Sequence, residues 1–212
     1  HKLLISGKQR NRSGKLSLSE SISIIIFYHF SPYKNFKLYY EYTVTGGTLF
    51  TNPPCYDRFI QIIPSLFLPV MIMLHYLSGN KTGLYYVDST YFGVCKNIRI
   101  SSHKTFKGLA TRGHSSIDWF YGFKLHMIIN ERGEIIAIKI TQGNVDDRKA
   151  FEEMIVNKNL KGKCYGDKGY ISEPLFNRLY RRGLTLITGI KRNMKNYLLP
   201  ILDKVMLKKR FI

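Results

Sequence analysis

The chain has few of the residues that stabilise small secreted proteins or zinc ribbons. It contains three cysteines in 212 residues, Cys55, Cys95 and Cys164, and no two of them are close in the sequence. Such spacing indicates neither a disulfide framework nor a zinc ribbon, so we expect a reducing, intracellular compartment. The N-terminus has no signal-peptide pattern, and no internal repeat or low-complexity tract is present.

Acidic residues are also scarce. The chain has 14 Asp and Glu against 33 Lys and Arg, which gives a formal net charge of +19. Residues 161–212 contain 13 Lys or Arg and only three acids, and residues 96–112 contain no acid at all. A chain of this kind attracts polyanions, so a nucleic acid, DNA or RNA, is the expected partner. The alternative is that the basic residues form solvated surface, and the charge does not distinguish a DNA-binding protein from an RNA-binding one.

Long apolar runs are limited to one stretch, residues 59–77, whose length is close to that of a membrane span. Gln61, Pro64, Pro69 and His75 interrupt it. We therefore interpret this stretch as a kinked, buried helix pair, and we expect no association with a membrane.

The residue pattern changes near residues 79–83. Before this point, residues 1–80 predict a small helical region, with helical spacing of apolar or aromatic side chains over residues 18–30, 33–42 and 59–77. We interpret these aromatic side chains as core. After it, residues 81–212 have the period of strands and form a second domain.

Two acids follow apolar strands in this second domain. Asp88 ends the run 84–87, and Asp167 ends the run 162–166, so we expect each acid at the end of a strand. Two such carboxylates suggest a shared cation site that handles phosphates, because hard divalent cations prefer oxygen ligands.

A hairpin is predicted between these two strands. Residues 119–129 and 134–140 flank the turn Asn130–Gly133. Alternation places Lys124 and His126 on a polar face, either exposed to solvent or facing phosphates. The other face is apolar and contains Phe123, Leu125, Met127, Ile129, Ile136, Ile138 and Ile140. The basic segment 93–116 before the hairpin is expected to be an extended loop or an insertion.

Two helices complete the pattern. Asp146 or Asp147 is expected to cap a helix, with metal ligation as the alternative. Ser172 is expected to cap a second helix that Gly183 ends, and a strand follows at 184–190. The resulting order, strand, hairpin, helix, strand, helix, strand, predicts an α/β mixed sheet with flanking helices.

Several motifs fall in register along the chain: Tyr86–Thr90, Cys95–Asn97, His103–Gly108, Trp119–His126, Gly143–Asp147 and Gly166–Tyr170. Together they resemble the DDE transposases of bacterial insertion sequences, over roughly residues 15–212. The resemblance implies a ribonuclease H-like mixed β-sheet with flanking helices, preceded by a small helical N-terminal region that recognises DNA ends.

The resemblance also implies the site. In that family three acids hold two divalent cations, usually Mg²⁺ with Mn²⁺ as an alternative, and Asp88 and Asp167 match the first and second acid as catalytic residues and metal ligands. The implied activity is DNA cleavage and strand transfer during transposition. The implied partners are element ends and target DNA, bound by a homo-oligomer in the bacterial cytoplasm.

Basic residues around these motifs are candidate phosphate contacts, and capping or surface roles stay open for each of them. The candidate DNA-binding residues are Lys96, Lys104, Lys107, Arg112, Lys124, His126, Lys168, Lys191, Arg192 and Lys195.

One feature departs from the family. Only Glu173 and Asp203 follow Asp167, and neither fits the third acid, because Glu173 is too close and residues 202–205 resemble the stretch before the family's Glu. We expect a fragment, cut at both ends, that binds DNA without transposing it. The alternatives are a non-catalytic nucleic-acid-binding remnant and a cellular nuclease of the same fold.

Overall fold

The computed structural model describes residues 16–115, 118–191, 194 and 199–209. The chain forms two compact units, His1–Tyr76 and Leu77–Ile212. The division falls four residues before the boundary expected from the sequence. Each unit is described by itself.

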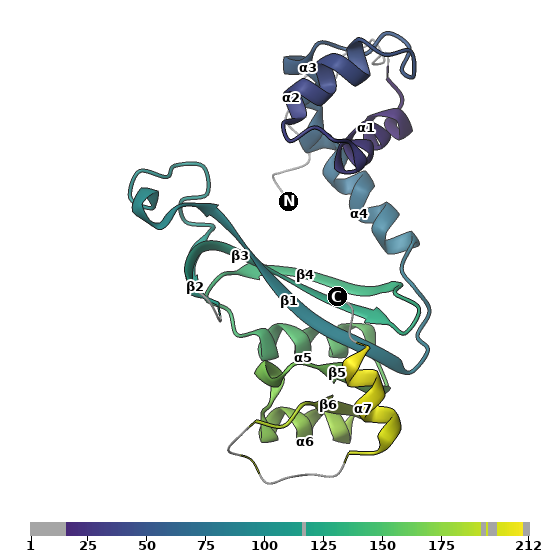
Figure 1. The fold of residues 1–212 in the computed structure, drawn as a ribbon, viewed down its shortest axis with the longest axis vertical. Coiled ribbons are helices and arrows are strands. Elements are labelled where there is room, and N and C mark those ends of the chain that lie inside the picture. The colour runs from purple at the N-terminus through teal and green to yellow at the C-terminus, as the bar shows by residue number, and fades with distance from the viewer. Residues whose placement is uncertain (1–15, 116–117, 192–193, 195–198, 210–212) are drawn as a thin grey trace. The chain divides into compact units, whose positions relative to one another are not determined.

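The first unit is helical (Figure 1). Helix α1 (Leu18–Phe30) has the predicted bounds, because Ser17 accepts a hydrogen bond from the Glu20 N–H while the Glu20 side chain accepts one from the Ser17 N–H. The further elements are α2 (Phe36–Tyr39), the π-helix η1 (Tyr40–Thr45), α3 (Tyr56–Ile62), the 3₁₀-helix η2 (Ile63–Leu66) and α4 (Phe67–Tyr76).

Aromatic side chains form the core of this unit, as predicted. Tyr40 and Phe59 are fully buried, and their ring centroids lie 4.9 Å apart. Burial raises the pKa of Tyr40 to about 12. These rings therefore serve packing and do not form a platform for base stacking.

The apolar stretch at 59–77 is kinked as expected, at η2, where Pro64 lies at the start of the 3₁₀ turn. The expectation that it is buried is wrong for its second half, because α4 has no buried residue. By length and composition alone the helix Tyr56–Tyr76 could cross a membrane, and only 11% of its most apolar window is buried. The absence of membrane association stays a prediction.

The second unit is a mixed sheet with helices on both faces (Figure 1). The strand order is β2-β3-β1-β5-β6, and β4 also pairs with β3. Strands β1, β5 and β6 are parallel, whereas β3 is antiparallel to β1, β2 and β4. The strands are β1 (Leu84–Cys95), β2 (Thr111–His114), β3 (Trp119–Asn130), β4 (Ile135–Gln142), β5 (Gly162–Gly166) and β6 (Leu184–Thr188). The helices are α5 (Asp147–Lys158), α6 (Glu173–Arg181) and α7 (Ile201–Lys208).

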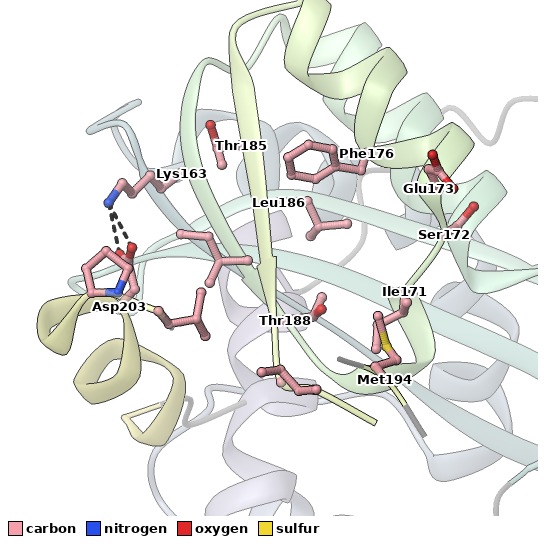
Figure 2. A pocket seen from close by; sticks show the side chains of 15 residues that line it. Lys163, Ile171, Ser172, Glu173, Phe176, Thr185, Leu186, Thr188, Met194 and Asp203 are labelled. Atoms are coloured by element: carbon pink, nitrogen blue, oxygen red, sulfur yellow. Dashed lines mark hydrogen bonds and ion pairs between the residues drawn. The ribbon is translucent and has the colours of Figure 1, made fainter. Parts of the chain in front are cut away.

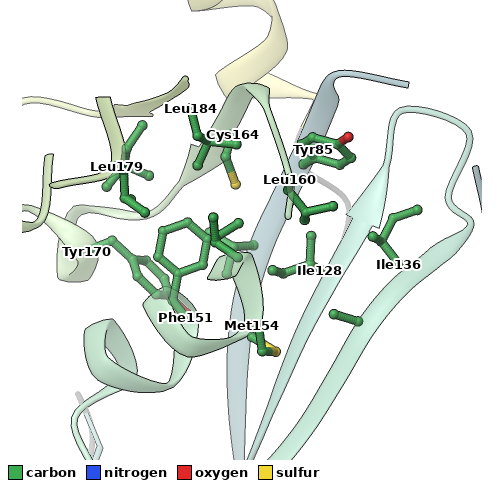
Figure 3. Close-up of a cluster of buried hydrophobic side chains, with 14 of the residues drawn as sticks. Tyr85, Ile128, Ile136, Phe151, Met154, Leu160, Cys164, Tyr170, Leu179 and Leu184 are labelled. Carbon is green, nitrogen blue, oxygen red and sulfur yellow. The ribbon is translucent and has the colours of Figure 1, made fainter. Parts of the chain in front are cut away.

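The main core lies between one face of the sheet and helices α5 and α6. Figure 3 shows Phe151 and Met154 pointing from α5 toward Ile128 on β3, with Cys164 of β5 close by. All four side chains are at most 4% exposed. This cluster fixes α5 against the central strands.

The opposite face of the sheet carries α7. Tyr86 and Tyr165 are buried there, and the Tyr86 hydroxyl lies 3.3 Å from the Met206 sulfur on α7. Residues that alternate with Tyr86 and Tyr165 along β1 and β5 therefore point to the α7 side, because side chains two positions apart share a face.

Two sequence predictions need correction here. Asp88 does not end its strand, because β1 continues to Cys95. The reason is its long antiparallel pairing with β3, which holds β1 extended well past the acid. The segment 93–116 is likewise more ordered than the expected loop, since β2 pairs with β3.

The predicted hairpin is confirmed, but its faces are reversed. His126 is fully buried and the Lys124 side chain is 15% exposed, whereas Ile140 on the supposed apolar side is 61% exposed. The cause is register: His126 alternates with Ile128, whose side chain packs against α5. The polar face of the hairpin is thus the covered one.

Candidate active site

Asp88 lies on β1, and Asp167 directly follows β5, the parallel neighbour of β1. Leu84 pairs with Lys163 and Tyr86 pairs with Tyr165. The pairing ends there, and each acid lies two residues beyond it, Asp88 within β1 and Asp167 directly after β5. Alternation with Tyr86 directs the Asp88 side chain toward the α7 side of the sheet. Asp167, unlike Asp88, does follow its strand, as the sequence predicted.

A cavity of about 380 Å³ lies where β5 stops and β1 continues. Both acids line it, so the structure brings the two predicted catalytic residues together. Since β1 has no parallel neighbour beyond this point, side chains from both faces reach the cavity. Its remaining lining comes from Ser89, Thr90, Tyr91, His114, Ser115, Phe120, Lys124, Asp147 and Gly169.

A tight turn holds the Asp167 carboxylate. Asp167 caps the 3₁₀-helix η4 (Lys168–Tyr170), and its Oδ1 accepts a hydrogen bond of 2.8 Å from the Gly169 N–H. A Cβ atom at Gly169 would lie 2.9 Å from this oxygen, so only glycine allows the carboxylate to occupy this position without a shift. On the other strand, Asp88 Oδ1 accepts a hydrogen bond of 2.9 Å from the Ser89 N–H.

Tyr170 lies beneath these acids. Its side chain is 2% exposed, and its ring is 5.4 Å from that of Phe151. Burial raises the pKa of Tyr170, and the carboxylates of Asp147, Asp88 and Asp167 add to this effect. These three acids all line the same cavity.

The start of α5 borders the same cavity. Lys124 Nζ lies 2.9 Å from both Asp147 Oδ1 and the Val145 carbonyl oxygen. Asp146 is the helix cap, as predicted, because its Oδ1 accepts a hydrogen bond from the Arg148 N–H. Hydrogen bonds from the Arg148 side chain hold the pKa of Asp146 below its usual range. Asp147 is therefore a third carboxylate at the cavity, paired with a lysine.

His126 is packed inside the unit. Its Nε2 lies 2.8 Å from Thr141 Oγ1, while Nδ1 is buried without a hydrogen-bond partner in the part of the chain that the structure describes. Burial lowers the pKa of His126, and the nearby Asp147 opposes this shift. A neutral, fully buried imidazole is not placed to contact DNA in this conformation.

The other predicted DNA-binding residues are on the surface, apart from Arg192 and Lys195, which lie outside the described residues. Lys96 and Lys104 line one hollow beyond the end of β1. Lys168 is next to Asp167. The exposed cations are Lys96, Lys104, Lys107, Arg112, Lys168 and Lys191.

The two acids that follow Asp167 in the sequence lie elsewhere. Figure 2 shows Glu173 and Asp203 on opposite sides of a second hollow, with β6 between them. Asp203 Oδ1 accepts hydrogen bonds of 2.9 Å from Lys163 Nζ and 2.8 Å from the Tyr165 hydroxyl. Burial opposes ionisation of Asp203, but these two hydrogen bonds outweigh it and lower its pKa. Neither acid lines the cavity of Asp88.

The site fits a hard cation in part. Asp88 and Asp167 offer carboxylate oxygens, the ligands that Mg²⁺ and Mn²⁺ prefer. However, among the described residues no three His, Cys, Asp or Glu side chains are grouped so that they could hold a metal ion. The site therefore has two acids that could bind a cation, but the described residues do not supply a complete set of ligands.

Comparison with known proteins identifies the fold. In solved structures, the chain is similar to piggyBac transposase in a synaptic complex with hairpin DNA, with a TM-score of 0.54 and 12% identity over 89% of this chain and 46% of that one. It also matches Mos1 transposase in its strand transfer complex (TM-score 0.30, 8% identity, 86% and 60%) and its paired-end complex with Mn (0.32, 8%, 86% and 61%).

The piggyBac likeness agrees with the mixed sheet and flanking helices and confirms the predicted ribonuclease H-like fold. This chain spans about half the length of that transposase. No curated protein matches the sequence. A family model described as a transposase DDE domain matches residues 78–212, which is well over half of the chain and all but one residue of the second unit. The chain therefore belongs to the transposase DDE domain family.

Proposed function

We propose that this chain acts in DNA transposition, in cation-dependent cleavage and strand transfer of DNA. The observation that carries the proposal is that Asp88 on β1 and Asp167, directly after the parallel strand β5, line one cavity. Family membership gives the reaction class, since the matched domain is a transposase domain.

Each residue of the site has a separate proposed role. Asp88 and Asp167 hold the cation through oxygen atoms. The cation supplies the charge that lowers the pKa of an attacking water or 3′-hydroxyl and stabilises the leaving 3′-oxygen. Lys168, exposed next to Asp167, contacts a backbone phosphate of the substrate. Lys124 attracts the phosphates of the substrate less strongly, because its ammonium group is paired with the Asp147 carboxylate.

The proposal includes a limit on activity. The family needs a third acid. Neither Glu173 nor Asp203 lines the cavity, and Asp147, which does, is paired with Lys124. Loss of a ligand from a two-metal site removes most phosphoryl transfer. We propose that these 212 residues bind DNA and a cation but do not complete strand transfer.

The partners follow from charge and family. A net charge of +19 favours DNA. The helical first unit is proposed to recognise element ends, and the protein is proposed to act as a homo-oligomer on paired ends of a bacterial insertion sequence, in the cytoplasm. The similar piggyBac transposase was solved in a synaptic complex with hairpin DNA, which supports a DNA partner.

The test is DNA affinity with and without Mg²⁺, measured by fluorescence anisotropy for wild type and Asp88→Asn. At constant ionic strength we expect Mg²⁺ to strengthen binding by the wild type relative to Asp88→Asn, since in the variant Mg²⁺ only screens the DNA phosphates. Binding that ignores both Mg²⁺ and the substitution would instead establish a non-catalytic nucleic-acid-binding remnant, which the incomplete ligand set favours as the second candidate.

A strand-transfer assay separates the remaining alternatives. We expect the 212-residue chain to give no joined product. Magnesium-dependent joining that Asp88→Ala abolishes would overturn the limit on activity, and cutting without joining would indicate a nuclease of the same fold.

A further inference from the structure

The connection between β1 and β2 has features that the active site does not explain. It runs from Lys96 to Ala110 and begins with the 3₁₀-helix η3 (Asn97–Arg99). Figure 1 shows it projecting from the end of β1, away from α5 and α6 of the same unit. We call residues 96–110 the β1–β2 arm.

The arm encloses a hollow of about 620 Å³ whose charge is all of one sign. Lys96, Arg99 and Lys104 line it together with His103, and no carboxylate does. Within the described part of the chain, none of these three cations forms an ion pair. Cations gathered around one hollow repel each other, and an anion bound between them relieves this repulsion.

The hollow is held in shape by contacts with β3. Asn97 Nδ2 donates a hydrogen bond of 2.8 Å to the Trp119 carbonyl oxygen. The His103 ring stacks on Phe106, with centroids 5.9 Å apart, and Phe106 packs edge-on against Phe123 of β3 at 5.7 Å. His103 Nε2 accepts a hydrogen bond from the Phe106 N–H, which leaves the proton of a neutral ring on Nδ1. These contacts therefore hold the segment that carries the cations against β3.

An exposed apolar side chain lies between two of these cations in the sequence. Ile98 is 87% exposed, although its neighbour Asn97 is anchored and its flanking residues Lys96 and Arg99 line the hollow. Proteins that bind the minor groove use basic side chains and frequently insert an apolar side chain between base steps. The arm carries both kinds of side chain within four residues.

We propose that the β1–β2 arm grips duplex DNA: its hollow holds a backbone phosphate through Lys96, Arg99 and Lys104, and Ile98 enters the minor groove against a base step. The proposal rests on the proposed function for the identity of the polyanion. It adds a DNA contact that does not involve the cation site of Asp88 and Asp167.

The test measures the salt dependence of duplex binding by the full 212-residue chain. Each phosphate contact contributes about 0.9 to the slope of log K against log salt concentration. The double variant Lys96→Gln/Arg99→Gln removes the contact to one phosphate and is expected to lower this slope by about 1. The matched control is Arg132→Gln/Lys161→Gln, which also removes two exposed cations, neither of which lines the hollow, and a smaller change is expected for it.

Ile98→Ser separates the wedge from the charge. It should leave the salt slope unchanged and remove the fluorescence increase of a 2-aminopurine base placed in the duplex, which reports unstacking. Circular dichroism of each variant checks folding, and Arg99→Lys provides a conservative variant that keeps the charge.

Each outcome decides the proposal. If the double variant has the same salt slope as the wild type, the arm does not contact DNA. If the DNA affinity of the wild type still depends on Mg²⁺ and on Asp88, the proposed function stands in that case. No DNA binding by wild type overturns both. Stabilisation by inorganic phosphate beyond chloride at equal ionic strength, with DNA binding unchanged in the variant, assigns the hollow to free phosphate and overturns the DNA assignment.

Discussion

Lys124 Nζ on β3 lies 2.9 Å from Asp147 Oδ1 in the first turn of α5, at the rim of the cavity that Asp88 and Asp167 line. This ion pair joins the helix to the central hairpin. It also explains why a lysine in the middle of a covered strand face is tolerated, because its charge is paired and its ammonium group donates a second hydrogen bond to Val145.

Replacement of Lys124 by Met should therefore destabilise the second unit. Hydrogen bonds to charged groups contribute about 1.5–3 kcal/mol, and we expect the lower end because water still reaches Asp147. Urea unfolding measures the difference. Lys149→Met, on the exposed side of α5, is the matched control, and equal stabilities of the two variants would contradict the role of the pair.

Asp203 is expected to act in folding and not in cation binding. Asp203→Ala leaves the buried Tyr165 hydroxyl without its acceptor, which costs about 1–3 kcal/mol. Asp203→Asn, which keeps an acceptor oxygen, should lose less. The account of Asp203 fails if Asp203→Ala removes cation binding at unchanged stability in urea.

Stability should fall as the pH is lowered below about 6.5, because burial lowers the pKa of His126 from that ordinary value. The unfolded chain then binds a proton that the folded chain does not, so stability decreases by at most about 1.4 kcal/mol per pH unit for this one group. Carboxylates with lowered pKa values, such as Asp203, lose their contribution only near and below pH 4.

Urea midpoints measured between pH 7 and pH 5 check this prediction. His126→Gln should flatten the dependence on pH, whereas His75→Gln, a change at an exposed position, should not. An equally steep dependence in His126→Gln would show that another group is responsible.

Gly169→Ala should weaken cation binding with little loss of stability. The new Cβ would meet Asp167 Oδ1 at 2.9 Å, so the carboxylate must shift. Substitutions that disturb the orientation of a metal ligand typically cost 10-fold or more in affinity, and we expect about 10-fold. Gly93→Ala is the control, because its nearest contact is an ordinary 3.8 Å. Equal affinities would show that the turn does not position Asp167.

Local signals made part of the fold predictable from the sequence. The apolar spacing over residues 18–30 predicted α1, and Ser172 with Gly183 predicted α6, because each of these signals depends on residues close together in the sequence. The strand before Asp167 was found for the same reason, since its end coincides with a turn that Gly169 permits.

The remaining features depend on contacts between distant segments. Asp88 lies within a strand because β3 pairs along the whole of β1, and His126 is buried because α5 covers its side of the hairpin. Neither partner is visible in the local alternation of apolar and polar residues. Asp147 had a signal, the motif Gly143–Asp147, but only the structure shows that one acid caps the helix while the other borders the cavity.

The central claim is that Asp88 and Asp167 together hold a divalent cation, and a titration of the 212-residue chain with Mn²⁺, followed by electron paramagnetic resonance of the free ion, tests it most directly. We expect a bound cation in the wild type and in Asp203→Asn, and loss of that cation in both Asp88→Asn and Asp167→Asn. Binding that survives both of these substitutions would contradict the claim.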